Sequence, residues 1–248
     1  MDKPLEGCVA VVTGAARNIG RAIALALAGD GARLVVNARS SAKDAESVAA
    51  EIRERGGEAI VIMADLGDPA QVKALFEEAW AAYGRLDILV NNAAVRRETA
   101  LADIALEEWR DVLSSTLDAS FLCAQAAAAR MQGGGRIVNI GGLTAHAGAP
   151  GRAHVVTSKA GLVGLTKALA IELAPRAITS NIVVPGRIDT NRRASGLSEP
   201  VHHRYHASPL GIHGASEDVA EMVRHLAGPA GRYITGQTIH VNGGIYLP

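Results

Sequence analysis

The chain has 248 residues, of which 48% are hydrophobic and 20% are charged, and this composition is typical of one soluble α/β domain with a single core. Lys and Arg (25) balance Asp and Glu (25), so no basic excess indicates nucleic-acid binding or attachment to a membrane surface. Cys8 and Cys123 have no disulfide or metal-binding spacing, and the N-terminus lacks the layout of a signal peptide. We therefore expect a cytoplasmic protein without a metal site.

Short β-branched runs alternate with longer segments of helical periodicity along the whole chain. The expected strands are Val9–Val12, Leu34–Val36, Ala59–Met63, Leu86–Val90, Arg136–Ile140, Ile182–Val184 and Thr238–Val241. The expected helices are Ile19–Ala28, Ala42–Arg55, one that begins at Asp68 and Pro69, Leu106–Met131 and Ala153–Ala174. Continuous apolar strands separated by helices predict a doubly wound, Rossmann-like parallel sheet in a single domain over residues 1–248. A ligand of such a fold lies at the carboxyl ends of the strands.

A glycine-containing turn, Thr13–Gly20, joins the first expected strand to the first expected helix. Glycine lets the backbone approach a pyrophosphate group closely, and the N-terminus of the helix supplies free N–H groups and the positive end of its dipole. A glycine motif alone is weak evidence, but a position between a strand and a helix is the context that a dinucleotide site requires. The turn therefore predicts a bound dinucleotide.

Five segments, in this order along the chain, resemble the short-chain dehydrogenase/reductase family, and its 3-oxoacyl-carrier-protein reductase type in particular: Thr13–Gly20, Asp65-Leu66, Asn91–Ala94, Pro185–Thr190, and Ile234–Gln237 with Asn242–Gly244. The resemblance implies cofactor contacts from Gly14, Arg17, Asn18, Ile19, Gly20, Asp65, Leu66, Asn91, Asn92, Ala93, Lys159, Pro185, Gly186, Ile188 and Thr190. Asn18 stands where the family usually has a glycine, and asparagine tolerates left-handed backbone angles better than most residues. Asn242 replaces a more usual aspartate.

The residues after the second strand favour NADP(H) over NAD(H). An acidic residue there would bond the ribose 2′-hydroxyl and repel a 2′-phosphate. The chain instead has Asn37, Arg39 and Ser40, with no acidic residue. Arg39 and Arg17 are both candidates to face the phosphate, because a guanidinium group suits its geometry, although both arginines are also compatible with solvated surface positions.

The resemblance also implies four catalytic groups: a tyrosine that exchanges the proton, a lysine one helical turn later, a serine that polarises the carbonyl, and an asparagine on the preceding long helix. Aligned on Lys159, the tyrosine position holds Val155, the serine position holds Gly142 and the asparagine position holds Thr116. Only Lys159 is retained. Loss of a general acid/base alone lowers a rate by about 10²- to 10⁴-fold, so we expect ordinary ketoreductase activity to be weak or absent.

Several other side chains are candidates to replace the missing proton donor: Thr116, Thr144, His146, His154 and Tyr205. His154 is next to Val155, but adjacent helical residues point about 100° apart, so it is expected to face elsewhere. Thr144 and His146 follow the fifth strand, close to the vacant serine position. His202 and His206 have the spacing of a pair of metal ligands on a helix, but no third ligand is evident.

Three kinds of function remain open from the sequence. The first is an NADP(H)-dependent carbonyl or alcohol oxidoreductase with a non-standard proton donor. The others are a non-redox enzyme such as a lyase or dehydratase, and a nucleotide-binding partner or sensor without turnover. An irregular stretch at about residues 190–214 is expected to cover the pocket, and the small-molecule substrate is not identified. Small residues at positions 160, 161, 164 and 168, together with the family resemblance, predict a homo-oligomer, either a tetramer or a dimer.

Overall fold

The computed structural model describes residues 3–190 and 208–248, and it contains one seven-stranded sheet with the order β3-β2-β1-β4-β5-β6-β7. All pairings in it are parallel. The strands are β1 (Val9–Val12), β2 (Arg33–Ala38), β3 (Ala59–Met63), β4 (Ile88–Asn91), β5 (Arg136–Ile140), β6 (Thr179–Pro185) and β7 (Thr238–Val241). The predicted doubly wound α/β fold is confirmed. The strand order reverses between β1 and β4, and this switch point opens the ligand crevice of such folds.

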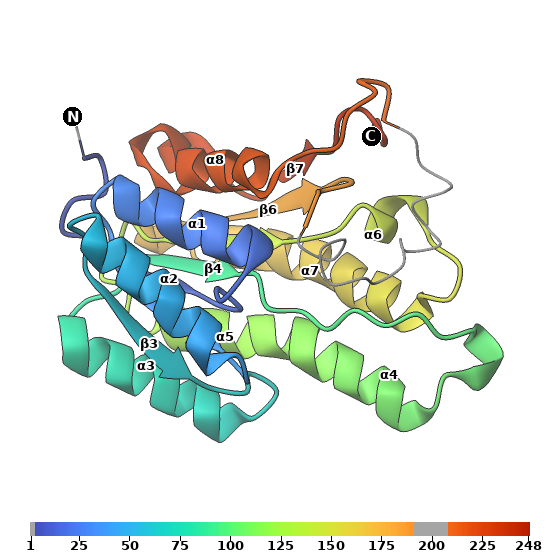
Figure 1. Cartoon of the computed structure of the whole chain (residues 1–248), viewed down its shortest axis with the longest axis horizontal. Coiled ribbons are helices and arrows are strands. Elements are labelled where there is room, and N and C mark those ends of the chain that lie inside the picture. Colours follow the sequence, from blue (N-terminus) through green and yellow to red (C-terminus); the bar gives the residue numbers. More distant parts are fainter. Residues whose placement is uncertain (1–2, 191–207) are drawn as a thin grey trace.

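Helices cover both faces of the sheet (Figure 1). One face is covered by α1 (Asn18–Gly29), α2 (Ala42–Glu54) and α8 (Ser216–Ala227), whose apolar side chains share one core cluster with the strands. The other face is covered by α3 (Pro69–Tyr83), α5 (Ala119–Ala128) and α7 (Ala153–Glu172). Within residues 3–190 and 208–248, no helix combines the length and the apolar character that crossing a membrane requires.

Helix α8 was not predicted, although its sequence carries the signal of an amphipathic helix. Val219, Val223 and Leu226 are buried at helical spacing, and they face α1 across the first core cluster. Asp218 Oδ2 accepts a hydrogen bond from Ala215 N at 2.7 Å, which satisfies a donor at the start of the helix. The predicted cap of α3 is confirmed, since Asp68 Oδ1 accepts from Ala70 N at 2.9 Å.

The single long helix predicted over Leu106–Met131 is interrupted in the structure. Helix α4 (Leu106–Leu113) is followed by a π-helical segment, Ser114–Asp118, and then by α5, which ends at Ala128. Two hydroxyl groups bond helical carbonyls here: Ser115 Oγ to Asp111 O at 2.6 Å and Ser120 Oγ to Thr116 O at 2.7 Å. Such bonds compete with the regular ladder, and π segments frequently occur at functional sites.

A chain of buried polar side chains joins the centre of the sheet to α7. Asn91 Nδ2 donates to Asn139 Oδ1 at 2.9 Å, and Asn139 Nδ2 donates to Thr166 Oγ1 at 2.8 Å. Asn91 Nδ2 also donates to Ser120 O at 3.2 Å, which connects β4 to α5. Asn139 and Thr166 are completely buried, so each of these bonds also avoids the cost of an unpaired buried polar group.

Replacing Asn139 with alanine should lower the free energy of unfolding by about 1–3 kcal/mol, because Asn91 and Thr166 each lose a buried partner. Urea unfolding at one fixed protein concentration measures this change. Gln125→Ala, at an exposed position of α5, should change it by no more than about 0.5 kcal/mol. Equal values for the two variants would contradict the structural role of this chain.

Candidate functional site

The predicted cofactor segments, together with the predicted catalytic position Gly142, lie at the carboxyl ends of six neighbouring strands. The Gly14–Gly20 turn follows β1, Arg39-Ser40 follows β2, Asp65-Leu66 follows β3, Asn92-Ala93 follows β4, Gly141-Gly142 follows β5 and Gly186–Thr190 follows β6. Because parallel neighbouring strands end at the same edge, segments far apart in the sequence form one continuous rim. This edge is therefore the candidate site.

Thr13 and Asn92 fasten the glycine turn to the end of β4. Thr13 Oγ1 accepts from Asn92 N at 2.9 Å and from Ala93 N at 3.0 Å, and it donates to Val90 O at 3.2 Å. Asn92 Nδ2 donates in return to Thr13 O at 2.9 Å and to Gly14 O at 3.0 Å. The two strands on either side of the switch point are thereby joined through side chains as well as through the sheet.

The turn itself fits a pyrophosphate. Gly14 and Asn18 have φ of 60° and 50°, so Asn18 takes a left-handed conformation, which asparagine tolerates better than most residues. A Cβ on Gly20 would lie 2.3 Å from Gly14 O and 2.5 Å from Asn92 Nδ2, so only glycine fits there. The side chain of Arg17 does not cap α1. The first N–H groups of this helix and the backbone of the turn therefore form a cradle for an anion.

Asn37 turns into the protein at the end of β2. Its Nδ2 donates to Ile62 O at 3.1 Å, its Oδ1 accepts from Gly14 N at 3.4 Å, and the residue is 1% exposed. Asn37 therefore supports the glycine turn from below. Arg17, Arg39 and Ser40 are exposed at the rim, and Arg39 Nη1 lies 3.9 Å from Asp65 Oδ2. An exposed pair at that distance holds Arg39 weakly, so it can turn toward a phosphate.

The loop after β6 packs closely against the C-terminal segment. A Cβ on Gly186 would lie 2.6 Å from Asn242 Cα, and Gly186 N donates to Val241 O at 2.9 Å. Ile188 pairs with Gly214 in an isolated bridge, so the two flanks of residues 191–207 are joined. A cover was expected at about residues 190–214. Residues 191–207 of this stretch, which include Tyr205, His202 and His206, lie outside the described residues.

Lys159 is buried under the rim, one helical turn after Val155 in α7. Its Nζ donates to Ile140 O at 2.6 Å, where β5 ends. Burial, with smaller contributions from the positive charges of Arg96 and Arg152, lowers the pKa of Lys159 to about 7. Sequence reasoning missed both arginines, because neither belongs to a motif that the resemblance assigned.

Of the three positions that the resemblance compares with tyrosine, serine and asparagine, the first two lie beside this lysine, and the third lies in a segment that packs against α7. Val155 is buried, and Gly142 lies so that an added Cβ would be 3.8 Å from Lys159 Cγ, with no nearer contact. Thr116 lies in the π segment beside α7, and its buried Oγ1 has no hydrogen-bond partner among the described residues. The site can therefore accept a serine side chain at position 142 without displacement of its neighbours.

His154 does not point toward Lys159. Its ring is fully buried, and its Nε2 lies 2.9 Å from Glu108 Oε1, which also accepts from Thr99 Oγ1 at 2.6 Å. These bonds lower the pKa of Glu108, the one from Thr99 most. His154 thus ties α7 to α4, and this geometry does not favour it as a proton donor.

His146 belongs to a cluster of three rings that the sequence did not indicate. It lies in α6 (Thr144–Ala147), and its ring centroid is 4.7 Å from that of His240 and 5.4 Å from that of Tyr246. Burial lowers the pKa values of both histidines, and the charge of His146 lowers that of His240 further, so this environment favours their neutral forms. Thr144, the first residue of α6, is buried. Both Thr144 and His146 therefore stay close to the loop that carries Gly142.

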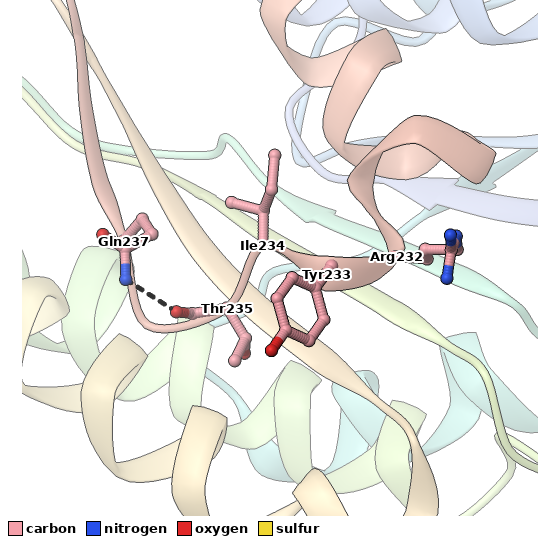
Figure 2. Close-up of a pocket in the computed structure, with 5 residues that line it drawn as sticks. All are labelled: Arg232, Tyr233, Ile234, Thr235 and Gln237. Carbon is pink, nitrogen blue, oxygen red and sulfur yellow. Dashed lines mark hydrogen bonds between the residues drawn. The ribbon is translucent and has the colours of Figure 1, made fainter.

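Two further features carry no chemistry in the site. A surface depression of about 430 Å³ is lined by five nearly consecutive residues at the turn before β7, with Tyr233 facing outward (Figure 2). Across the residues that the structure describes, no group of three or more His, Cys, Asp or Glu side chains is placed to hold a metal ion.

Comparisons with known proteins agree with this architecture. A family model described as Enoyl-(Acyl carrier protein) reductase matches residues 14–246. The 3-oxoacyl-[acyl-carrier-protein] reductase FabG of Staphylococcus aureus is 42% identical over 240 residues, which cover 96% of this chain and 98% of that protein. The 3-oxoacyl-[acyl-carrier-protein] reductase of Synechocystis is 43% identical over 246 residues, 98% of each chain.

Solved structures give the same result. A short chain dehydrogenase from Burkholderia cenocepacia in complex with NADP superposes with a TM-score of 0.92 and 38% identity, over 98% of this chain and 99% of that one. A blue fluorescent protein from a metagenomic library in complex with NADPH has a TM-score of 0.91 and 38% identity, over 98% of this chain and 100% of that one. This chain belongs to the short-chain dehydrogenase/reductase family.

Gly20→Ala should raise the dissociation constant for NADPH by about tenfold or more, because the added methyl group displaces the turn from Asn92. NADPH fluorescence titration measures the effect. Gly29→Ala is the matched control at the end of α1, where an added Cβ meets no atom within 4 Å, and it should bind NADPH like the parent protein. Unchanged binding by Gly20→Ala would place the nucleotide elsewhere.

The lowered pKa of Lys159 predicts the direction in which the free energy of unfolding changes with pH. Between about pH 7 and pH 10.5 the unfolded chain holds a proton on this lysine that the folded chain has released, so the free energy of unfolding should rise with pH in this range. In Lys159→Met this contribution should be absent. Lys167→Met, at an exposed position of the same helix, should keep it. Urea midpoints from pH 7 to pH 10 test the difference, and identical slopes for all three proteins would contradict it.

Proposed function

We propose that the protein is an NADP(H)-dependent carbonyl or alcohol oxidoreductase in which the proton is not supplied by the family's tyrosine. The observation that carries this proposal is Lys159, which is buried at the end of β5 beside a valine and a glycine at the two positions compared with catalytic tyrosine and serine. When bound, the cofactor supplies the hydride. Ordinary ketoreductase activity should then be weak or absent.

The cofactor assignment rests on shape and charge. The turn around Gly14 and Gly20 leaves room for a pyrophosphate, and the start of α1 is not capped by Arg17. Arg17 and Arg39 are exposed at the rim, and the residues that directly follow β2 include no acidic side chain that would repel a 2′-phosphate. The carboxylate of Asp65, after β3, lies 3.9 Å from Arg39. The NADP and NADPH complexes among the structural neighbours support the same choice.

A proton must still reach the carbonyl oxygen during reduction. Lys159 lies next to the vacated positions, and its pKa of about 7 allows it to exchange a proton at neutral pH. Thr116 and His146 are the other described groups that we propose for this role. Thr116 has a buried hydroxyl with no hydrogen-bond partner among the described residues, and His146 lies four residues after Gly142, in α6.

We further propose a homo-oligomer that uses the outer side of α7. The space beside Gly161 is occupied by a side chain of the same chain, since a Cβ there would lie 2.7 Å from Leu117 Cδ2. Gly164 and Ala168 are exposed, an added Cβ on Gly164 would meet nothing within 4 Å, and Ile171 is 79% exposed. Small and apolar residues on one exposed face let a second helix approach closely.

Restoring the family's groups tests the assignment of the pocket. The double variant Gly142→Ser with Val155→Tyr should reduce simple ketones about 10²- to 10⁴-fold faster than the parent, because it regains a general acid and a carbonyl donor. The assay follows NADPH absorbance. The matched control is Gly142→Ser with Val155→Phe, which has the ring without the hydroxyl and should gain far less.

Two results would contradict the proposal. Fast reduction of simple ketones by the parent protein would show that Val155 and Gly142 do not limit the chemistry. No gain in the double variant, with NADPH affinity unchanged, would show that these residues do not face the nicotinamide. A parent protein that binds NADPH without any turnover would instead favour the nucleotide-binding partner or sensor.

A further inference from the structure

The amino group of Lys159 is held in a fixed and mostly apolar place. The residue is 9% exposed, and its Nζ donates to Ile140 O at 2.6 Å, where β5 ends. Val155 stands one helical turn earlier on the same face of α7 and is 4% exposed. A backbone carbonyl is a neutral acceptor. This bond therefore fixes the position of the amine without offsetting an ammonium charge, as a carboxylate would.

An open space lies beside the stem of this lysine, on the side of the loop after β5. Gly142 is partly exposed, and a Cβ added to it would meet Lys159 Cγ at 3.8 Å and no other atom within 4 Å beyond its chain neighbours. The preceding residue differs, because a Cβ on Gly141 would lie 3.0 Å from both Ile182 Cδ1 and Val184 Cγ2. A small molecule can therefore approach Lys159 from the side of Gly142.

The charged groups that act on Lys159 favour a neutral amine. The positive charges of Arg96 and Arg152 oppose its protonation, in addition to burial. Glu108 of α4 faces α7, but its carboxylate bonds His154. The pKa of Lys159 is therefore about 7, whereas an ordinary lysine titrates near about 10.4. A large share of this amine is neutral at pH 7.

We propose that Lys159 is a nucleophile that forms an imine with small neutral aldehydes and ketones, which enter beside Gly142. The lone pair of Nζ attacks the carbonyl carbon and gives a carbinolamine, which then loses water as the C=N bond forms. The carbonyl oxygen leaves with the two protons of the amine, so the step needs no oxidant or reductant. A desolvated lysine in an apolar pocket is suited to this reaction.

This activity is separate from the reduction proposed above. Proton exchange uses the amine as an acid or a base and leaves it unmodified, whereas imine formation makes a covalent bond from Nζ to carbon and uses no hydride. The inference therefore does not rest on the proposed function. Neutral carbonyl compounds are expected because the neighbouring side chain, Val155, is apolar and buried.

Borohydride trapping tests the inference on the unmodified full-length protein. The protein is mixed with butanal, samples are quenched with borohydride at set times, and peptide mass spectrometry locates the butyl group on each lysine. At pH 7 Lys159 should be labelled about tenfold or more faster than Lys167, an exposed lysine of the same helix, because a protonated amine cannot attack a carbonyl. Lys167 is thus an internal control in every sample.

The pH dependence gives a second readout from the same samples. The labelling rate of Lys159 should rise up to about pH 7 and then level off, since the amine is neutral above its pKa. An ordinary lysine should continue to gain reactivity toward about pH 10. A ratio of Lys159 to Lys167 labelling below about tenfold at pH 7, or a Lys159 rate that still rises steeply to pH 10, would overturn the inference.

Two substitutions at one position test where the carbonyl compound enters. Gly142→Leu should slow labelling of Lys159 by about tenfold or more, because its side chain fills the space beside the lysine stem. Gly142→Ala is the matched control, since its Cβ makes only an ordinary contact at 3.8 Å, and it should be labelled like the parent. Equal labelling of the two variants would overturn entry beside Gly142. If Gly142→Leu does not fold, the comparison of Lys159 with Lys167 in the parent still decides the inference.

NADPH oxidation is measured separately with the same aldehyde. Rapid trapping on Lys159 without NADPH oxidation would support the imine and count against the oxidoreductase. NADPH oxidation without preferential trapping would support the oxidoreductase and remove the imine. The two proposals can therefore fail independently.

Discussion

The hydrogen bonds between Thr13 and the Asn92-Ala93 backbone are the constraint on which the site depends. They join the ends of β1 and β4, the two strands between which the order of the sheet reverses. This connection holds the turn against β4, and Gly14 and Gly20 can approach each other and Asn92 because Gly20 has no Cβ. Asn37 supports the turn from the opposite side. The cradle is thus held by neighbours on both flanks, and a ligand need not organise it.

The second half of the site is defined by charge more than by hydrogen-bonding side chains. Val155, one helical turn before Lys159, is buried, Gly142 has no side chain, and the positive charges of Arg96 and Arg152 lower the pKa of the same lysine. Removing a neighbouring hydroxyl and adding cations both make a charged ammonium harder to maintain. The lowered pKa of Lys159 is the physical basis of the proton exchange that we propose for it.

Local sequence signals predicted elements well where one residue type governs the backbone. Asp68 at the start of α3 and Asn18 in the first turn behave as their chemistry predicts. The π segment between α4 and α5 was not predicted, because the long run of helix-forming residues carries no sign of an extra residue per turn. Helix α8 was missed although its apolar stripe is regular, since an irregular stretch precedes it.

The sequence by itself determined the fold class and the position of the dinucleotide turn, since apolar periodicity and the glycines act over short stretches. It also placed Lys159 four residues after a valine, and it pointed to the family. Only the tertiary structure decided that Asn37 turns inward, that His154 bonds Glu108, and that the charge of Arg96 acts on Lys159. These pairs are separated by tens of residues, and their contacts follow from the packing of strands and helices, which no local pattern encodes.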